Sequence, residues 1–414
     1  MSARWNPLPP EPSDLDDHAV RLQGDALQGK RIALLVCGGI AAIKAPLLVR
    51  ELRRQGAEIT VFVSEEALRY TTEEALAWSS DRPVISRLSS RSEHLSGQMA
   101  FDACLVAPAT YNTLNKFRNG IADTLLTTFL ASALGRLERG QTRILVAPTL
   151  HGSMHNAILT ESLNALQEMG VEVIPPKQGD GKHLLPELEE IVMRTARSLT
   201  ASPLRGIPVL VTGGPTPVHL DQIRRLTNRF TGQLGIAIAK ELWLAGAEAY
   251  LIQGESGLIP PVWLPHQIVP DYATYQQTVL KVLAEREMPV GIFSAAVADY
   301  SPREVYPGKR PSGETEWELK LVPTEKVIQR VQTSFPELML ISFKFEAQLS
   351  HAELMQIARQ RLESGHAAVI ANRAEEQGAE QVAWLVTPHQ PELRMESKAG
   401  IARALKLWLE QALK

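Results

Sequence analysis

Residues 31–39 read RIALLVCGG and residues 209–216 read VLVTGGPT, and the predicted fold follows from these two stretches. Each is a short apolar run, rich in β-branched side chains, that ends in a pair of glycines, as a buried parallel strand does before a tight turn. A helical pattern follows the first stretch up to Gly56, and EITVFVS at 58–64 has the composition of a second strand. Strand, helix and strand within about 34 residues have the size of one βαβ unit.

The second stretch begins the same pattern again, after a longer loop at 217–232, with a helix predicted over 233–244 and a strand over 247–254. Because the pattern starts twice, the sequence predicts two doubly wound, Rossmann-like α/β domains with mainly parallel sheets. The stretch SLTASPLR at 198–205 is the predicted boundary. We therefore expect a mobile tail, a first domain and a second domain at residues 1–28, 29–200 and 205–414.

The composition of the 414 residues is that of an ordinary globular protein, with 44% hydrophobic and 21% charged residues. The formal net charge of -3 gives no reason to expect a nucleic-acid partner. Two cysteines, Cys37 and Cys104, are too few for a disulfide framework or a thiolate zinc site, so we expect a cytoplasmic protein without a metal site of its own. No apolar run reaches the ~18–20 residues of a membrane helix, so we expect no membrane partner.

Ligands of open parallel sheets bind at the carboxyl ends of the strands, and both glycine pairs are predicted to lie there. Gly38–Gly39 and Gly213–Gly214 would let the backbone approach a phosphate, and the helix that follows would offer unpaired N–H groups. Neither turn has the GxGxxG or the Walker pattern, so a tight connection without a ligand remains the alternative. A third strand end, CLVAPATYNT, places Thr110 and Asn112 where they would either contact a ring or phosphate or cap a helix.

Motifs in both halves carry a family resemblance. The first half has motifs similar to those of flavin-containing cysteine decarboxylases: GGIAAIK at 38–44, APATYNT at 107–113 and GIADTLLTT at 120–128. The second half has motifs that resemble phosphopantothenoylcysteine synthetase: GGPT at 213–216, LDQIRRLTNRFTGQLG at 220–235 and AAVADY at 295–300. Their order resembles the bacterial bifunctional phosphopantothenoylcysteine decarboxylase/phosphopantothenate–cysteine ligases of coenzyme A biosynthesis.

The resemblance implies that the second half joins 4′-phosphopantothenate to cysteine with CTP and Mg²⁺, through an acyl-cytidylate that cysteine displaces. Asn228 matches the residue that holds this intermediate, and a carboxamide offers both a donor and an acceptor. Lys309 matches a lysine of the second half-reaction, although a lysine in a proline- and glycine-rich loop is otherwise a solvated side chain. The positions that match nucleotide contacts are Gly213, Gly214, Thr216, Asp221, Thr231, Gly232, Ala295, Asp299 and Phe343.

The resemblance implies that the first half binds FMN and decarboxylates the ligase product to 4′-phosphopantetheine. His94 has the family spacing of a catalytic histidine, where an imidazole suits general-base work, and a polar loop histidine is the alternative. Asn112 would hold the substrate carboxylate, while His151 and Met154 occupy the substrate clamp. The positions that match flavin contacts are Gly38, Gly39, Ile40, Ser64, Ala107, Thr110 and Asp123.

The sequence departs from the family pattern at three places. Residues 230–233 read FTGQ where the family commonly has Ser-Ser-Gly-Lys, which leaves the choice between CTP and ATP open. The clamp motif Pro-x-Met-Asn-x-x-Met is retained only at Pro148 and Met154, with His151 in place of the asparagine. The reductive cysteine expected within 177–187 is missing, and both cysteines of the chain lie in predicted strands as small core residues.

These departures leave three outcomes open for the first half: decarboxylation with another proton donor, release of an oxidised ene-thiol, or an unrelated use of the pocket. Two other functions remain as alternatives to this bifunctional enzyme. One is a flavoenzyme for another cysteinyl or carboxylate substrate, and the other is a non-catalytic flavin- or nucleotide-binding paralogue. The resemblance also implies a homo-oligomer with a trimeric first domain and a dimeric second domain, whose other partners are small molecules.

Overall fold

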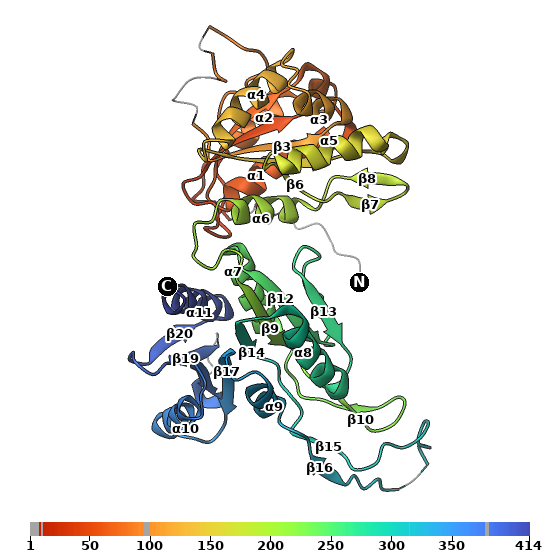
Figure 1. Ribbon diagram of the computed structural model, residues 1–414, viewed down its shortest axis with the longest axis vertical. Coiled ribbons are helices and arrows are strands. Elements are labelled where there is room, and N and C mark those ends of the chain that lie inside the picture. Colours follow the sequence, from red (N-terminus) through yellow and green to blue (C-terminus); the bar gives the residue numbers. More distant parts are fainter. Residues whose placement is uncertain (1–7, 10, 91, 95–99, 314, 377–380) are drawn as a thin grey trace. The chain divides into compact units, whose positions relative to one another are not determined.

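The computed structural model describes residues 8–9, 11–90, 92–94, 100–313, 315–376 and 381–414. The chain forms two compact units, Met1–Leu199 and Thr200–Lys414, and each is built around its own sheet (Figure 1). Both main sheets are mainly parallel and carry helices between their strands, so the predicted fold class is confirmed. The division between the units falls inside the predicted boundary at 198–205.

A five-stranded parallel sheet organises the first unit. The strand order is β2-β1-β3-β4-β6, with the bounds Glu58–Val63, Arg31–Val36, Ala103–Ala109, Arg143–Pro148 and Glu172–Val173. β1 is buried except at Arg31 and β3 is buried throughout, which explains why both sequences are continuous apolar runs rather than alternating ones. Because β2, β1 and β3 are parallel neighbours, their carboxyl ends lie side by side.

Two groups of helices accompany this sheet. The first group is α1, α2 and α6 and the second is α3, α4 and α5, with the bounds Ala45–Arg54, Glu73–Ser80, Leu188–Ser198, Tyr111–Arg118, Leu125–Leu137 and Ala157–Glu168. Within the groups, α1 contacts α2 and α6, and α3 contacts α4 and α5 (Figure 1). The core of the second group includes a cluster of aromatic rings, Phe62, Phe101 and Phe129, with Phe62 and Phe129 centroids 4.4 Å apart.

A small antiparallel sheet lies beside the main sheet of the first unit. Its order is β5-β8-β7, with the bounds Leu150–His151, Lys182–Leu184 and Lys177–Gly179. The 3₁₀ helix η4 (Gly152–Met154) follows β5 directly, while η1 (Ile40–Lys44) and η2 (Glu65–Arg69) follow β1 and β2. The sheet thereby joins the expected clamp segment to the stretch in which the family cysteine is missing.

The tail extends less far along the chain than the predicted residue 28. Leu27 is fully buried, and the backbone N–H groups of Gln23 and Leu27 donate to carbonyls at the end of α1, Arg54 at 2.8 Å and Gln55 at 2.9 Å. The indole of Trp78 also donates to Asp17 at 3.3 Å. The prediction of a mobile tail up to residue 28 is therefore wrong at its later part; residues 1–7 and 10 lie outside the described residues.

An eight-stranded sheet organises the second unit, in the order β13-β12-β9-β14-β17-β18-β19-β20. The bounds of these strands are His266–Val269, Glu248–Gly254, Pro208–Gly213, Val290–Phe293, Met339–Glu346, Ala368–Arg373, Val382–Val386 and Leu393–Glu396. The first six strands are parallel, and the last two add antiparallel to the edge.

The helices of the second unit lie along this sheet. They are α7, α8, α9, α10 and α11, with the bounds Gln233–Leu244, Tyr272–Arg286, Val327–Ser334, His351–Glu363 and Lys398–Ala412, and the short η5 spans Ala374–Glu376. α7 occupies the residues that the sequence predicts and packs against α11. α8 and α9 share a separate core cluster with buried residues of the central strands, including Leu210, Ile252 and Leu340.

Two hairpins extend from the second unit. β10 (Val218–His219) pairs antiparallel with β11 (Arg225–Leu226), and β15 (Tyr300–Pro302) pairs antiparallel with β16 (Leu321–Pro323). The loop after β9 and the arm between β15 and β16 carry residues 217–232 and 303–320, which contain most of the motif at 220–235 and the expected Lys309. Of the helices that the structure describes, none combines the length and the apolar composition needed to cross a membrane.

Candidate functional site

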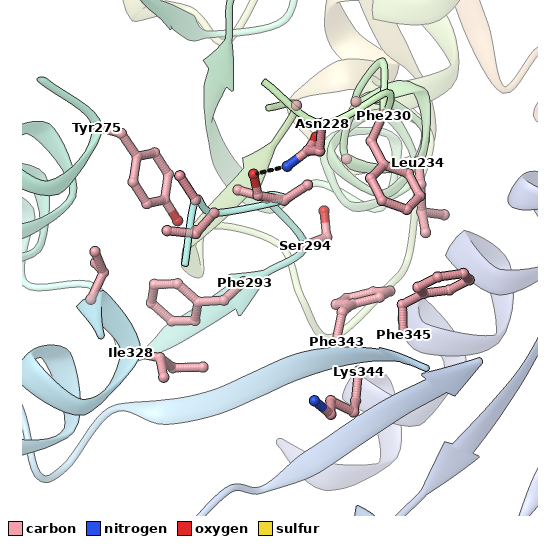
Figure 2. Close-up of a pocket in the computed structure, with 18 of the residues that line it drawn as sticks. Asn228, Phe230, Leu234, Tyr275, Phe293, Ser294, Ile328, Phe343, Lys344 and Phe345 are labelled. Atoms are coloured by element: carbon pink, nitrogen blue, oxygen red, sulfur yellow. Dashed lines mark hydrogen bonds between the residues drawn. The ribbon is translucent and has the colours of Figure 1, made fainter. Parts of the chain in front are cut away.

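A cavity of about 790 Å³ opens in the second unit at the carboxyl ends of β9, β14 and β17. Figure 2 shows two apolar ends with polar groups between them. Phe230, Phe343 and Phe345 gather with Leu234 at one end, and Asn228 and Ser294 lie in the middle. The other end is lined by Tyr275, Phe293 and Ile328.

The N-terminus of α7 opens into this cavity. Gly232 is the N-cap with a φ of 80°, and no side chain caps the helix, so its first N–H groups remain available. A Cβ at Gly232 would lie 2.1 Å from Gln253 Nε2 and 2.6 Å from Gly214 N, so only glycine fits here. Residues 231–235 line the cavity, and the positive end of the helix dipole makes this wall suitable for a phosphate.

The carboxamide of Asn228 lies in the centre of the cavity. Its Nδ2 donates to the carbonyl oxygen of Ala296 at 2.7 Å, the bond drawn in Figure 2. Its Oδ1 is buried and has no hydrogen-bond partner among the described residues. Since buried polar atoms are normally paired, this acceptor is available to a donor from a ligand or a bound water.

The aromatic end of the cavity contains a cation that sequence reasoning missed. Phe230 and Phe345 meet edge to face with ring centroids 5.7 Å apart. Behind them, Arg361 donates to the carbonyl oxygen of Phe343 at 3.0 Å and to Ser342 Oγ at 3.2 Å. Burial lowers the pKa of Arg361, and burial together with Arg361 lowers the pKa of His366 to about 4. At neutral pH this end therefore offers aromatic faces beside the partly desolvated cation of Arg361.

In the first unit, three helices begin just after the carboxyl ends of β2, β1 and β3: η2, η1 and α3. Gly39 precedes η1 without any side-chain cap. Ser64 Oγ accepts from Ala67 N at 3.2 Å to cap η2, and Thr110 Oγ1 accepts from Thr113 N at 3.4 Å to cap α3. The capping alternative for Thr110 is thus confirmed. A Cβ at Gly38 would lie 2.4 Å from the Cβ of Glu66, so close packing on η2 requires this glycine.

The comparison with known protein families and relatives covers both units. A family model described as "Flavoprotein" matches residues 21–200, and one described as "DNA/pantothenate metabolism flavoprotein C-terminal domain" matches residues 204–412. The chain is 36% identical to the coenzyme A biosynthesis bifunctional protein CoaBC of Thermococcus kodakarensis over 86% of this chain and 88% of that protein. The chain belongs to the CoaBC family.

Other CoaBC relatives agree with this assignment. The Bacillus subtilis protein is 30% identical over 85% of this chain and 88% of its own length. Among solved structures, the DNA/pantothenate metabolism flavoprotein from Streptococcus pneumoniae is 27% identical, covers 50% of this chain and all of its own, and has a TM-score of 0.45.

The CoaBC family motifs of the second unit converge in part on the cavity. The expected residues that line it are Gly214, Asn228, Thr231, Gly232, Ala295, Asp299 and Phe343. Gly213 instead permits the close approach of β9 to α7, since a Cβ there would lie 3.1 Å from the Cα of Gly235. Thr216 is buried and its hydroxyl accepts from Ala298 N at 2.9 Å, so it supports the 295–299 wall rather than facing the cavity.

Asp221 was expected to contact the nucleotide, and the structure gives it a different task. Its carboxylate is buried and accepts from the backbone N–H groups of Ile223 at 2.7 Å, Arg224 at 2.6 Å and Arg310 at 3.2 Å. Burial opposes its ionisation, but these bonds and the Arg224 guanidinium outweigh burial and hold its pKa at about 2. Asp221 therefore ties the loop after β9 to the arm.

Lys309 lies on the arm and not among the residues that line the cavity of its own unit. It is exposed, and its neighbours are held by the loop after β9. The carbonyl of Gly308 accepts from Gln222 N at 3.1 Å, and Arg310 N donates to Asp221. The backbone on both sides of Lys309 is thus fixed, while its side chain is left at the surface.

The other residues expected at the first site lie on η1, α3 and β3 and in two loops that contact α3 or α4. Ile40 and Asn112 are exposed on the first turns of η1 and α3, whereas Ala107 is buried within β3. Asp123 forms an ion pair with Lys116 Nζ at 2.7 Å, and this hydrogen bond lowers its pKa. His94 is anchored to α4, because Ser132 Oγ donates to its carbonyl oxygen at 2.7 Å.

The expected substrate clamp has changed its chemistry. His151 Nδ1 accepts from Ser153 N at 3.2 Å and so caps η4, while Met154 is exposed. Two further histidines, His155 and His183, form a hydrogen bond that sequence reasoning missed. The antiparallel pairing of β5 with β8 brings the segments that carry them together, and no sequence motif signals it.

Both cysteines are core residues, as the sequence predicts. Cys37 and Cys104 are each 1% exposed, and burial raises the pKa of both thiols. In the part of the chain that the structure describes, no three His, Cys, Asp or Glu side chains are grouped so that they could hold a metal ion.

Proposed function

We propose that this CoaBC-family chain is a bifunctional enzyme of coenzyme A biosynthesis. The second unit joins 4′-phosphopantothenate to cysteine with nucleotide activation. The first unit decarboxylates the resulting 4′-phosphopantothenoylcysteine to 4′-phosphopantetheine. The observation that supports the ligase best is the buried, unpartnered Oδ1 of Asn228 in a cavity that also contains the open N-terminus of α7.

In the second unit, each part of the cavity suits one part of an acyl-nucleotide. The N–H groups at the start of α7 would bind a phosphate of the nucleotide, and the rings of Phe230, Phe343 and Phe345 would stack on its base. Asn228 would hold the acyl-phosphate with Nδ2 already fixed by Ala296 and Oδ1 accepting from the ligand. We propose CTP with Mg²⁺ as the nucleotide, the metal being held mainly by phosphate oxygens and water.

The ligase proposal is tested by the nucleotide product. Purified protein should release CMP when mixed with CTP, Mg²⁺, 4′-phosphopantothenate and cysteine. ATP in place of CTP decides the nucleotide choice, because Gln233 stands where the family commonly has lysine. Failure to release CMP or AMP under either condition would remove the ligase function.

For the first unit we propose FMN as the cofactor. The uncapped start of η1 after Gly38–Gly39 offers N–H donors for a phosphate, and Ser64 keeps its O–H free to donate while it caps η2. Thr110 and Asn112 border the same edge on α3. These groups fit a ring system with a phosphate tail. When bound, FMN supplies the reversible oxidation that activates the cysteinyl carboxylate for loss of CO₂.

The absorbance spectrum of the purified protein tests FMN binding. Flavin bands in the blue region are the expected result, and a colourless protein that takes up no added FMN would favour a non-catalytic first unit. The buried state of both thiols favours one second candidate, an oxidative decarboxylase that releases the ene-thiol. Product mass decides, because that product is two hydrogens lighter than 4′-phosphopantetheine.

We also propose that the chain works as a homo-oligomer, with the first units in trimers and the second units in dimers. The exposed apolar side chains Ile40, Ile43 and Leu47, on η1 and α1, suit contact with another copy next to the flavin site. Dilution to a monomer should then release FMN, and a monomer that retains it would contradict the trimer. A cytoplasmic location, expected from the low cysteine content, stays a prediction.

A further inference from the structure

The first unit contains a histidine pair that the functions above leave unused. His155 Nδ1 lies 2.7 Å from His183 Nε2, and the ring centroids are 4.8 Å apart with 38° between the planes. His155 follows η4, and His183 lies on β8, where it pairs with Leu150 of β5. The small sheet therefore joins the expected clamp to the segment that lacks the family thiol.

The outer nitrogens of the pair have different surroundings. His155 Nε2 lies 3.5 Å from Thr160 Oγ1, whereas His183 Nδ1 is buried and without a hydrogen-bond partner among the residues that the structure describes. In a neutral pair one ring donates in the shared bond and the other accepts, so an added proton resides on an outer nitrogen. His183 Nδ1 is thus a proton-carrying or proton-accepting atom that no described group of the chain satisfies.

The residue that follows His155 contacts α3, whose start is where the substrate carboxylate is expected. Asn156, the residue after His155, caps α5, and its Oδ1 lies 3.4 Å from the hydroxyl of Tyr111. Tyr111 stands between Thr110 and Asn112 on α3. The chain directly after His155 is therefore in contact with the first turn of α3, which follows the carboxyl end of β3.

Formation of 4′-phosphopantetheine creates a need for a proton donor at this place. When CO₂ leaves, the electron pair of the broken C–C bond enters the double bond of an ene-thiol, and a proton must arrive at that carbon when the ene-thiol is reduced. Neither thiol can meet this need, because Cys37 and Cys104 are buried in the core strand region of the first unit. An imidazole can, since it exchanges protons near neutral pH.

We propose that His183, hydrogen-bonded to His155, is the proton donor of the first unit, an inference that rests on the decarboxylase function proposed above. The N–H bond at His183 Nδ1 breaks as the C–H bond forms at the carbon that has lost CO₂. The electron pair of the ene-thiol double bond becomes this C–H bond, and the N–H pair stays on the neutral ring. His155 keeps the ring oriented through the 2.7 Å bond, and water restores the proton.

Two variants and a matched control test the proposal in the full chain. His183→Gln and His155→Gln remove the two members of the pair, while His389→Gln alters an exposed histidine of the second unit. Formation of 4′-phosphopantetheine from 4′-phosphopantothenoylcysteine should fall at least about 100-fold in His183→Gln and less in His155→Gln. CMP release by the second unit, retained FMN and the His389→Gln rate should stay at wild-type levels.

A second readout needs neither turnover nor a folded variant. In ¹⁵N-histidine-labelled wild-type protein, added 4′-phosphopantetheine should shift the imidazole nitrogen signals of His183 and leave those of His389 unchanged. Unchanged His183 signals, or variants that form product within twofold of wild type, would overturn the proton-donor assignment alone. A wild-type protein that releases no CO₂ would overturn the proposed decarboxylase function and this inference with it.

Discussion

The candidate site of the second unit is a cavity with a buried polar atom in its centre, whereas several residues expected around the first site lie on the surface. Asn228 Oδ1 is buried inside the cavity, while Ile40 is 67% exposed and Met154 is 43% exposed. A buried polar atom without a partner in the chain can be satisfied by a ligand or a bound water, without another copy of the chain. Exposed apolar side chains at a site require further cover, which a flavin ring and another copy of the chain would supply.

The largest expected effect is on the activity of the cavity in the second unit. Asn228→Asp should lower CMP release by about 100-fold or more, because a carboxylate cannot donate to the Ala296 carbonyl and brings a charge into the buried centre of the cavity. FMN retention and decarboxylation should be unchanged. Asn164→Asp, at an exposed position of α5, is the control and should leave both activities intact. Equal losses in both activities would mean that the two sites are not independent.

The next largest effect is on stability, at the start of α7 in the cavity of the second unit. Gly232→Ala should lower the free energy of unfolding by about 2 kcal/mol or more, since the new Cβ meets Gln253 and Gly214 in addition to the left-handed strain. Gly257→Ala has a similar φ of 81° and no atom within 4 Å, so it should cost only about 1 kcal/mol. Denaturant titration measures both. Equal costs would show that the wall at α7 is less tightly packed than its geometry indicates.

The Asp221 anchor gives a smaller, pH-dependent effect. Asp221→Asn should lower the melting temperature at pH 7 by several degrees, because the ionised carboxylate ties the loop after β9 to the arm. Its pKa is depressed from 3.8 to about 2, so the stability that it contributes is present above pH 4 and is lost as the pH falls toward 2. Melting curves of the variant and wild type should therefore converge between pH 4 and pH 2. A constant difference over this range would exclude the carboxylate charge as the cause.

The smallest effect on stability is expected at the site of the first unit. Asp123→Asn should change the melting temperature by no more than about one degree, because exposed ion pairs such as Asp123–Lys116 contribute little. The fraction of FMN retained after purification is measured on the same samples. A fall of several degrees would show that this ion pair stabilises the first site. The two sites would then differ less than the exposed fractions of their side chains indicate.

Some of the site could be predicted from the sequence because its groups are local. The glycine pairs, the helix at 233–244 and the cap at Thr110 depend on backbone conformation and short-range hydrogen bonds, which residue types at fixed spacing determine. Asn228, Thr231 and Phe343 were found through motifs, and the structure places all three on the cavity wall. Thr216 and Asp221 belong to the same motifs, yet a motif does not show whether a side chain faces a ligand or its own backbone.

The sequence alone determined that there are two α/β units, each with a mainly parallel sheet. The reason is that apolar runs ending in glycines commonly form buried parallel strands in such folds. Tertiary structure alone decided the position of Arg361 behind the aromatic end, the task of Asp221 and the meeting of His155 with His183. Each of these contacts joins segments that are distant in sequence or belong to different elements. Their energies depend on burial and on distances of a few ångströms, which exist only once the sheets have formed.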